Sequence, residues 1–437
     1  MNEHSNIQFP EKIYLSGADC FHLMLEMNEK KHEIGNNVIR IIFHFDDIGS
    51  ITNLLSNIKT SPLTHWICNI SLKEGGLFQK PYWHYFNQGK TIQILEHHHR
   101  IQHQIPSEIL QRKIDLKTQC LFEFDIIHYP DDKIALVFSW HHILMDARGS
   151  GMFIRHLNHL ETISDKSFNH FFPAKEKYVS PYRYIRNMYI VKRFIRNSTL
   201  DSISTTLFDK QLSKKIFTVK SISFSDEETQ LIDQHAKLYG AKFGANIFLI
   251  ACCAHGINDM NKRYGCAETI WVPIPYDGRK RGGNGPIITN CISFLFYKLD
   301  QKDLESIESS VKCISQQMND QIKIEMPKKY NLFLDMMRYI PLKLYHFLVS
   351  NSSKGVVASF LYTSAGENFW DTNQLLNIPI NDILILPPFT FPPGMTLSFL
   401  RHNNKLKMNI VYCEDLFSQN DIDELENSIK KYFFTSK

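Results

Sequence analysis

The segment 134–160 joins three patterns that together constrain the fold: a strand, a tight turn and a helix. Residues 134–138 form an apolar run typical of a buried strand, and between Phe153 and Leu160 apolar residues recur at the spacing of one helix face. His141 and His142 lie where the first pattern gives way to the second. Because successive side chains of a strand point to opposite faces, we expect one imidazole to serve the structure and the other to face a cleft.

The residues after the histidines favour acid–base chemistry. Asp146 follows His142 by four residues and Gly149 follows three residues later, so the carboxylate can fix the turn. A neutral imidazole can take a proton from a hydroxyl, an amine or a thiol near neutral pH, which favours His142 as a general base. Two other interpretations remain open: a pair of buried structural histidines, or a metal site. We expect no metal, because the sequence has no His-Glu-x-x-His motif and no cysteine pair at zinc spacing.

Composition and charge narrow the class of protein. A length of 437 residues predicts two to three domains, and 43% hydrophobic with 22% charged residues is ordinary for a globular protein. A net charge of +4 is too small to indicate a nucleic-acid partner. Nine scattered cysteines and no signal-peptide pattern favour reduced thiols and a cytoplasmic location. The sequence has no run of 18 apolar residues, so it predicts no membrane span.

Strand and helix patterns alternate along both halves of the chain, which predicts an α/β sandwich with mixed strand pairing. We place an N-terminal half at residues 1–197, a polar crossover linker at 198–215 and a C-terminal half at 216–437. In the second half, residues 287–296 are expected to form one strand after a loop rich in glycine and arginine.

The segment 178–197 combines basic and aromatic residues without an acidic residue. One interpretation is a helix packed on the domain, with cations that extend to water. The other is a contact for anionic phosphates, an acidic carrier protein or a membrane surface.

Five motifs in their order along the chain resemble the condensation-domain and chloramphenicol-acetyltransferase-like superfamily, including its stand-alone HHxxxDG acyltransferases. They are the opening turn Leu15–Asp19, His141-His142-x-x-x-Asp146, the helix entry Gly240–Asn246, the strand Asn290–Phe294 and the late strand Pro393–Ser398. They cover nearly the whole chain, and their order argues against a chance match. The sequence departs from the family at Ala147, where the family has glycine; Ala147 must therefore avoid positive φ.

The resemblance implies a fold and a reaction. Two α/β halves, each similar to one acetyltransferase subunit, would form a pseudo-dimer with a central tunnel and His142 at its middle. An acyl-CoA or a phosphopantetheine-linked acyl group on an acyl carrier protein would enter from one face, and a hydroxyl or amine acceptor from the other. His142 would activate the acceptor without a covalent acyl-enzyme. The resemblance implies a monomer with no permanently bound cofactor.

The resemblance also implies roles for single residues. Asp146 would be mainly structural and paired with an arginine, for which position nominates Arg279, with Gly149 in the turn beside it. Asn290, Ser293 and Ser398 are expected to bind substrate. The donor to the oxyanion stays open between Ser398 and a backbone N–H near Gly149.

Two other functions compete with a free-standing acyltransferase of secondary or lipid metabolism. One is a lipid acyltransferase similar to wax-ester and diacylglycerol synthases, in which apolar stretches such as Tyr330–Val349 contact a membrane. The other is a non-catalytic interaction protein that keeps the fold. The intact His141, His142 and Asp146 favour an enzyme.

Overall fold

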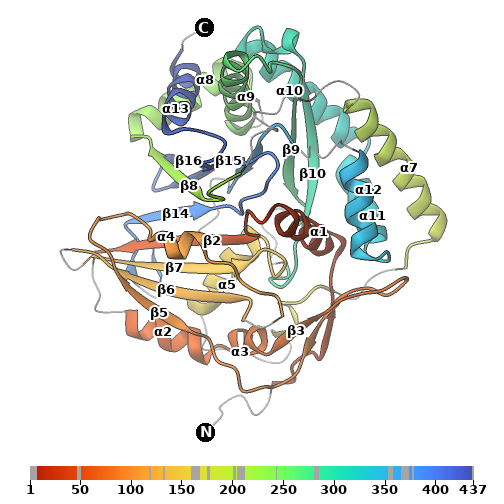
Figure 1. Cartoon of the computed structure of the whole chain (residues 1–437), viewed down its shortest axis with the longest axis vertical. Helices are drawn as coiled ribbons and strands as arrows, with labels where there is room; N and C mark the ends of the chain where they lie inside the picture. Colours follow the sequence, from red (N-terminus) through yellow and green to blue (C-terminus); the bar gives the residue numbers. More distant parts are fainter. Residues whose placement is uncertain are drawn as a thin grey trace.

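The structure is a computed structural model that describes residues 7–46, 51–117, 120–130, 133–158, 168–174, 178–199, 203, 212–242, 244–279, 285–352, 358–365, 374–375 and 378–435. The predicted linker at 198–215 lies largely outside the described residues, so its limits remain a prediction. Two lobes are stacked along the long axis, with the N-terminus at the far end of one and the C-terminus at the far end of the other (Figure 1).

The first lobe is built on a five-stranded sheet with the order β14-β2-β7-β6-β5. Its strands are β2 (Val38–Phe45), β5 (Ile94–His98), β6 (Phe122–His128), β7 (Ile134–His141) and β14 (Asp382–Leu386). Every residue of β2 and β7 is buried, so these strands are covered on both faces. β5 and β6 are parallel and the other pairs antiparallel, which confirms the mixed pairing.

The second lobe is built on a four-stranded sheet with the order β11-β15-β16-β8. Its strands are β8 (Phe217–Ser223), β11 (Leu361–Ser364), β15 (Met395–His402) and β16 (Lys405–Cys413). A hairpin of β9 (Ile270–Asp277) and β10 (Ile292–Leu299) adjoins this sheet, where Ser359 N–H donates to the Trp271 carbonyl at 2.8 Å. Two small sheets pair β1 (Lys12–Tyr14) and β3 (Ile70–Lys73) with β4 (Tyr82–Tyr85), and β12 (Gln374–Leu375) with β13 (Ile378–Pro379).

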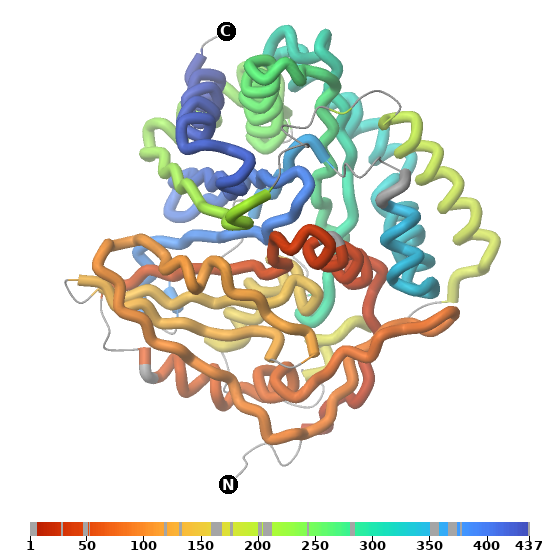
Figure 2. Tube along the Cα trace, viewed as in Figure 1, coloured from red at the N-terminus to blue at the C-terminus, as the bar shows by residue number. Residues whose placement is uncertain are grey.

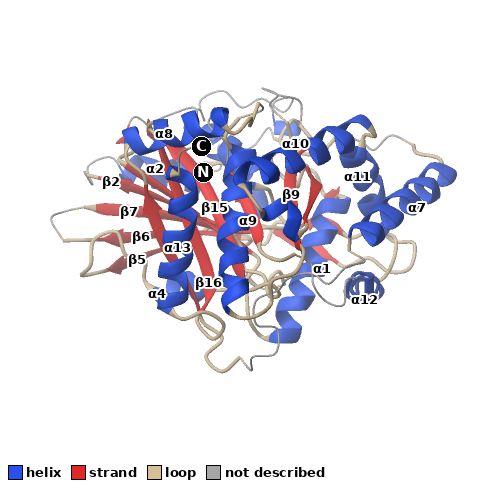
Figure 3. Ribbon diagram, turned by 90° about the horizontal axis from the view of Figure 1, so that it is seen from above, coloured by secondary structure: helices blue, strands red, loops and turns tan. Residues whose placement is uncertain are grey.

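Helices cover the sheets. Those of the first lobe are α1 (Gly17–His32), α2 (Ile51–Thr60), α3 (Pro62–Cys68), α4 (Ser107–Gln111) and α5 (Ala147–Asn158). Those of the second lobe are α8 (Asp226–Leu238), α9 (Asn246–Arg263), η2 (Gln301–Leu304), α10 (Ile307–Lys323) and α13 (Gln419–Phe434). Figure 3 shows α9 and α13 lying across the sheet that contains β15 and β16. A third group, α7 (Pro181–Ser198), α11 (Met326–Met337) and α12 (Leu342–Ser352), lies beside the lobes (Figure 1).

Serine capping boxes begin α1, α8 and α13. Ser16, Ser225 and Ser418 each form a reciprocal capping box with the acidic residue three positions later. Such a box satisfies two backbone N–H groups that would otherwise lack partners at the first turn. The box at Ser16 matters for function, because it fixes the start of α1 beside the cavity described below.

The prediction of one strand over residues 287–296 is wrong in its first half, because β10 begins only at Ile292. Ile287 and Ile288 donate their N–H groups to the Phe171 carbonyl at 2.8 and 2.9 Å, and Asn290 N–H donates to Asp19 at 2.7 Å. These contacts hold the segment as a connection to the first lobe and keep it out of a β ladder.

β14 ties the lobes together. It is contributed by the second half of the chain, yet it pairs with β2 of the first lobe over five residues. Lys407 of β16 forms an ion pair with Asp382, and the Asn409 amide donates to the Ile385 carbonyl at 3.2 Å. The late, blue part of the chain therefore lies beside the early, red part (Figure 2).

Candidate active site

His142 lies at the end of the central strand of the first sheet, and its backbone is held from two sides. The N–H of His141 donates to the Leu121 carbonyl at 2.9 Å, and that of His142 donates to the Asn37 carbonyl at 2.7 Å. The chain then turns, and α5 begins at Ala147. Ala147 does not have positive φ, as expected for a residue with a side chain at this turn.

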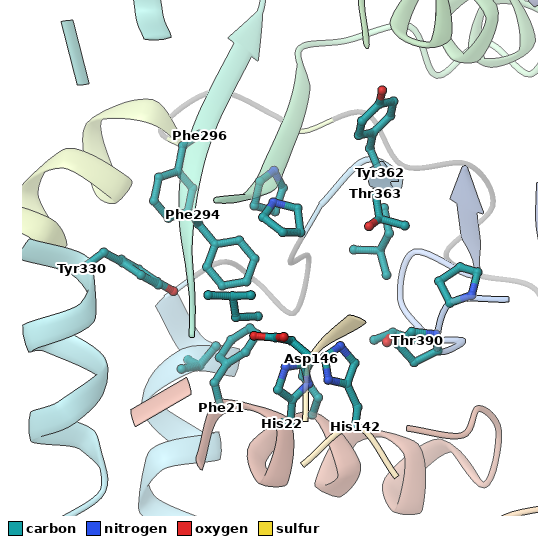
Figure 4. Close-up of a pocket in the computed structure, with 18 of the residues that line it drawn as sticks. Phe21, His22, His142, Asp146, Phe294, Phe296, Tyr330, Tyr362, Thr363 and Thr390 are labelled. Atoms are coloured by element: carbon teal, nitrogen blue, oxygen red, sulfur yellow. The ribbon is translucent and has the colours of Figure 1, made fainter. Parts of the chain in front are cut away.

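The two lobes enclose a cavity of about 1340 Å³ around this turn. Its polar lining from the first lobe includes His22, His142 and Asp146. Figure 4 shows the two histidines and Asp146 at one wall, with aromatic side chains to one side and Tyr362 and Thr363 across the cavity. The aromatic lining includes Phe21, Trp271, Phe294, Phe296, Tyr330 and Phe333. The cavity lining is therefore mainly apolar.

Asp146 binds the turn and the second lobe together. One carboxylate oxygen accepts the N–H of Gly149 at 2.8 Å. The other accepts the Arg279 guanidinium and the N–H of Cys291, both at 2.8 Å. The side chains of Asp146 and Arg279 are 5% and 3% exposed, so this is a buried ion pair. Asp146 thus lies against Arg279, the partner nominated from sequence.

Gly149 has a steric reason to be glycine. A Cβ at this position would lie 2.7 Å from the Ile287 carbonyl oxygen and 3.0 Å from the Cβ of Met145. A side chain here would therefore push apart the turn and the segment that leads to Asn290.

Asn290 supports the turn that carries His142 and is not among the described residues that line the cavity. Its amide donates to the His142 carbonyl at 2.8 Å and to Asp19 at 2.9 Å. Asp19 is buried, which raises the pKa of its carboxyl to about 6 despite hydrogen bonds from Asn290 and Ser16. The substrate-binding role expected for Asn290 therefore finds no support in its position, which is a structural link between α1 and the turn.

The two serines expected to bind substrate differ in position. Ser293 is fully buried, its hydroxyl donates to the Pro327 carbonyl at 2.7 Å, and it is absent from the described cavity lining. Ser398 lines the cavity, and its buried hydroxyl has no protein partner among the described residues. Thr396 and Asn409 line the same region, each with a buried oxygen that lacks a partner there. Alternation along β15 places Thr396 and Ser398 on one face, so the period of two in this strand is the sequence signal that indicates Thr396 beside Ser398.

The two adjacent histidines occupy different environments. His141 is 2% exposed and does not line the cavity in the described part of the chain. Its Nδ1 accepts the N–H of Ile143 at 3.3 Å, and its Nε2 lies 3.6 Å from Glu26. His142 lines the cavity, and because its Nδ1 is buried, Nε2 is the nitrogen that a substrate can reach.

Burial keeps both rings neutral. It lowers the pKa of His141 to about 3, with a further contribution from His142. Burial also lowers the pKa of His142, against the opposing effects of its own backbone carbonyl, Asp146 and Asn290. At neutral pH the His142 ring is therefore an acceptor of protons, as a general base must be.

The buried histidines predict acid sensitivity of the fold. The folded-state pKa of His141, about 3, lies below the unfolded value, so the stabilisation is complete above about pH 6.5 and is lost as the pH falls toward 3. We expect His141 alone to lower the free energy of unfolding by about 1.4 kcal/mol between pH 7.5 and pH 5.5. Urea denaturation at both pH values measures this, with His141→Gln as the comparison. An unchanged pH dependence in the variant would contradict the assignment.

In the described ranges, no three His, Cys, Asp or Glu side chains are grouped so that they could hold a metal ion. No described helix has both the length and the apolar character needed to cross a bilayer.

Comparison with known proteins identifies the fold. No model of a protein family matches this chain, and no curated protein matches its sequence. Solved structures do match, among them the trichothecene 15-O-acetyltransferase TRI3 from Fusarium sporotrichioides, with a TM-score of 0.71, 12% identity and coverage of 97% of this chain and 95% of that chain. The first condensation domain of the calcium-dependent antibiotic synthetase, in complex with a substrate analogue, matches with a TM-score of 0.66 and 13% identity. The match covers 97% of this chain and 95% of that chain. The wax ester synthase/diacylglycerol acyltransferase from Marinobacter aquaeolei VT8 matches with a TM-score of 0.57 and 13% identity. The match covers 96% of this chain and 98% of that chain.

These matches extend over both lobes. The chain has the two-lobed α/β fold of condensation domains and chloramphenicol-acetyltransferase-like acyltransferases. The fold predicted from the ordered motifs is thereby confirmed.

Proposed function

We propose that this protein is an acyltransferase that moves an acyl group from a thioester to a hydroxyl or amine, with His142 as general base. The observation that carries the proposal is a neutral His142 with its Nε2 side open to a cavity enclosed by both lobes. A cavity of about 1340 Å³ exceeds the usual range for one small ligand, about 300–1,000 Å³, so it has room for donor and acceptor together.

The proposed reaction needs one proton acceptor. His142 Nε2 takes the proton of the acceptor O–H or N–H while the acceptor atom attacks the thioester carbonyl carbon. The tetrahedral intermediate then breaks its C–S bond, and the leaving thiolate takes the proton from the imidazolium. Holding both substrates in one cavity replaces an encounter of two molecules by a positioned attack. The Ser398 hydroxyl, which belongs to a cavity-lining residue and has no partner among the described residues, is a candidate donor to the oxyanion.

Charge at the cavity supports a phosphate-bearing donor. Lys192 and Arg196 of α7 line the cavity, and the described helix contains no acidic residue. Their cations suit the phosphates of coenzyme A or of the phosphopantetheine arm of an acyl carrier protein. The apolar lining suits a long or aromatic acyl group, or an apolar acceptor.

The test is release of free thiol from a panel of acyl-CoA donors, with mixed alcohols and amines as acceptors. Release that requires the acceptor would support the proposal and begin to name the acceptor. Without release, acylated carrier proteins are the next donors. Failure of both classes, combined with tight binding of a carrier, would support the non-catalytic interaction protein instead.

A second candidate, a lipid acyltransferase at a membrane surface, is favoured by one observation. The outer face of α7 exposes Tyr182 (73%), Ile185 and Tyr189 (64%) among its arginines, and α12 exposes Phe347 (57%). Both helices also contribute residues to the cavity lining. Aromatic and basic residues on one helix are typical of helices that lie at an anionic lipid surface.

This candidate predicts that the protein sediments with vesicles of anionic lipid at low salt. Tyr182→Ser combined with Tyr189→Ser should lower the bound fraction several-fold, because the exposed rings supply the apolar contact. Phe86→Ser, which removes an exposed ring elsewhere, is the matched control. Protein that stays in the supernatant with anionic vesicles would eliminate the lipid-surface candidate.

A further inference from the structure

The orientation of the His142 ring is not explained by its hydrogen bonds. Both oxygens of Asp146 are taken by Gly149, Arg279 and Cys291. Nδ1 of His142 is buried and has no partner among the described residues. The Asn37 carbonyl and the Asn290 side-chain amide bind the main chain of His142 rather than its ring nitrogens.

A second imidazole lies against the ring. His22 of α1 is stacked on His142, with ring centroids 3.7 Å apart and planes inclined by 21°. His22 is 4% exposed, lines the cavity and has no hydrogen-bond partner for either ring nitrogen in the described ranges. Figure 4 shows the two rings side by side at the cavity wall, one from α1 and one from the end of β7. A buried imidazole without partners costs free energy, so its position requires an explanation.

We propose that His22 is a positioning residue for the base: its flat ring holds the His142 imidazole in one orientation, with Nε2 toward the substrates, and excludes water from the covered face. This inference rests on the proposed function. It assigns to a stacked ring the orienting task that a hydrogen-bonded carboxylate performs in a Ser-His-Asp triad.

The surroundings keep His22 uncharged. Burial lowers the pKa of His22 well below its ordinary value, and the neighbouring imidazoles of His142 and His141 lower it further. The titratable and charged groups around the pair are His141 and Asp146 from the β7–α5 segment, Arg279 paired with Asp146, Glu26 beside His141, and Asp19 bonded to Asn290. The Arg279 guanidinium in this group is paired with Asp146, and the His142 ring can accept a proton while its neighbour stays neutral.

Three variants separate the ring from its nitrogens. His22→Phe keeps a flat ring without nitrogen, and we expect it to retain kcat within a few-fold. His22→Ala removes the ring, and we expect kcat to fall by about 10- to 100-fold, since a small misplacement of a reacting group has effects of that size. His22→Leu keeps the bulk of the side chain without a flat ring. It replaces His22→Ala if that variant does not fold, and we expect the same loss of kcat. A kcat in His22→Phe as low as in His22→Ala would overturn the proposal, because the nitrogens would then be required.

A pH measurement separates positioning from mere packing and requires no substrate. His22→Ala admits water to His142, so burial lowers the His142 pKa less, and both the NMR titration of His142 and the acid limb of kcat/KM move to higher pH. His22→Phe should leave both unchanged. An unmoved His142 titration in folded His22→Ala would overturn the proposal. If the wild type transfers no acyl group, the proposed function fails, while the NMR titration still decides whether His22 shields His142.

Discussion

Replacing His142 by alanine is expected to lower the rate of acyl transfer by about 10²- to 10⁴-fold, the range that a positioned general base contributes. The loss should appear in kcat more than in KM, because the proton moves only in the transition state. The measurement is thiol release at saturating donor and acceptor, with far-UV circular dichroism to establish that the variant folds.

Two further variants make this result specific. His142→Gln keeps an amide of similar size and should be as impaired, because an amide does not accept a proton at neutral pH. His98→Ala removes an exposed histidine of β5 and should keep wild-type activity. A folded His142→Ala protein with more than about a tenth of wild-type activity would contradict a general-base role, given the contribution expected of such a base.

Replacing Asp146 by alanine should destabilise the protein by about 3–5 kcal/mol, the usual cost of leaving a buried charge without its partner. Among the described residues, the partly exposed Asp277, at 3.5 Å, would be the remaining carboxylate within ion-pair distance of the buried Arg279 guanidinium. The N–H groups of Gly149 and Cys291 would also lose their acceptor. Activity should fall as well, since the turn that carries His142 loosens. Urea denaturation and thiol release on the same preparation measure both effects.

Control variants separate charge from shape at this position. Asp146→Asn keeps the shape and loses the charge, so its free energy of unfolding should lie between those of the wild type and Asp146→Ala. Combining Asp146→Ala with Arg279→Met should recover part of the lost stability, because no buried charge is left alone. A stable, folded and inactive Asp146→Ala protein would instead indicate that the carboxylate takes part directly in the chemistry.

Local patterns in the sequence predict the elements around the site. The change from an apolar run to helical spacing places His141 and His142 at the end of β7. The nomination of Arg279 agrees with the contact to Asp146. These features depend on residues near in sequence, or on the order of motifs in the superfamily that the chain resembles.

Features that depend on distant contacts were missed. His22 lies in an apolar helical stripe, and nothing in its neighbourhood of the sequence indicates a ring stacked on His142, 120 positions later. Residues 287–291 have the composition of a strand, but their backbone groups bind Phe171 and Asp19. The apolar segment Asp382–Leu386 suits any buried strand, and only the folded structure shows that its partner is β2.

The crossing of β14 has a consequence for how the chain can be divided. Without it, β2 would become an unprotected edge with free N–H and C=O groups, which invites pairing with other chains. A fragment that stops before β14 would therefore be prone to aggregation, although it contains the histidines and most of its own core. The strand also restrains hinge opening between the lobes, because it pairs with β2 while its Asp382 binds Lys407 of the second lobe. The site thus depends on an intact polypeptide, because β14, the strand that holds it in shape, is synthesised late.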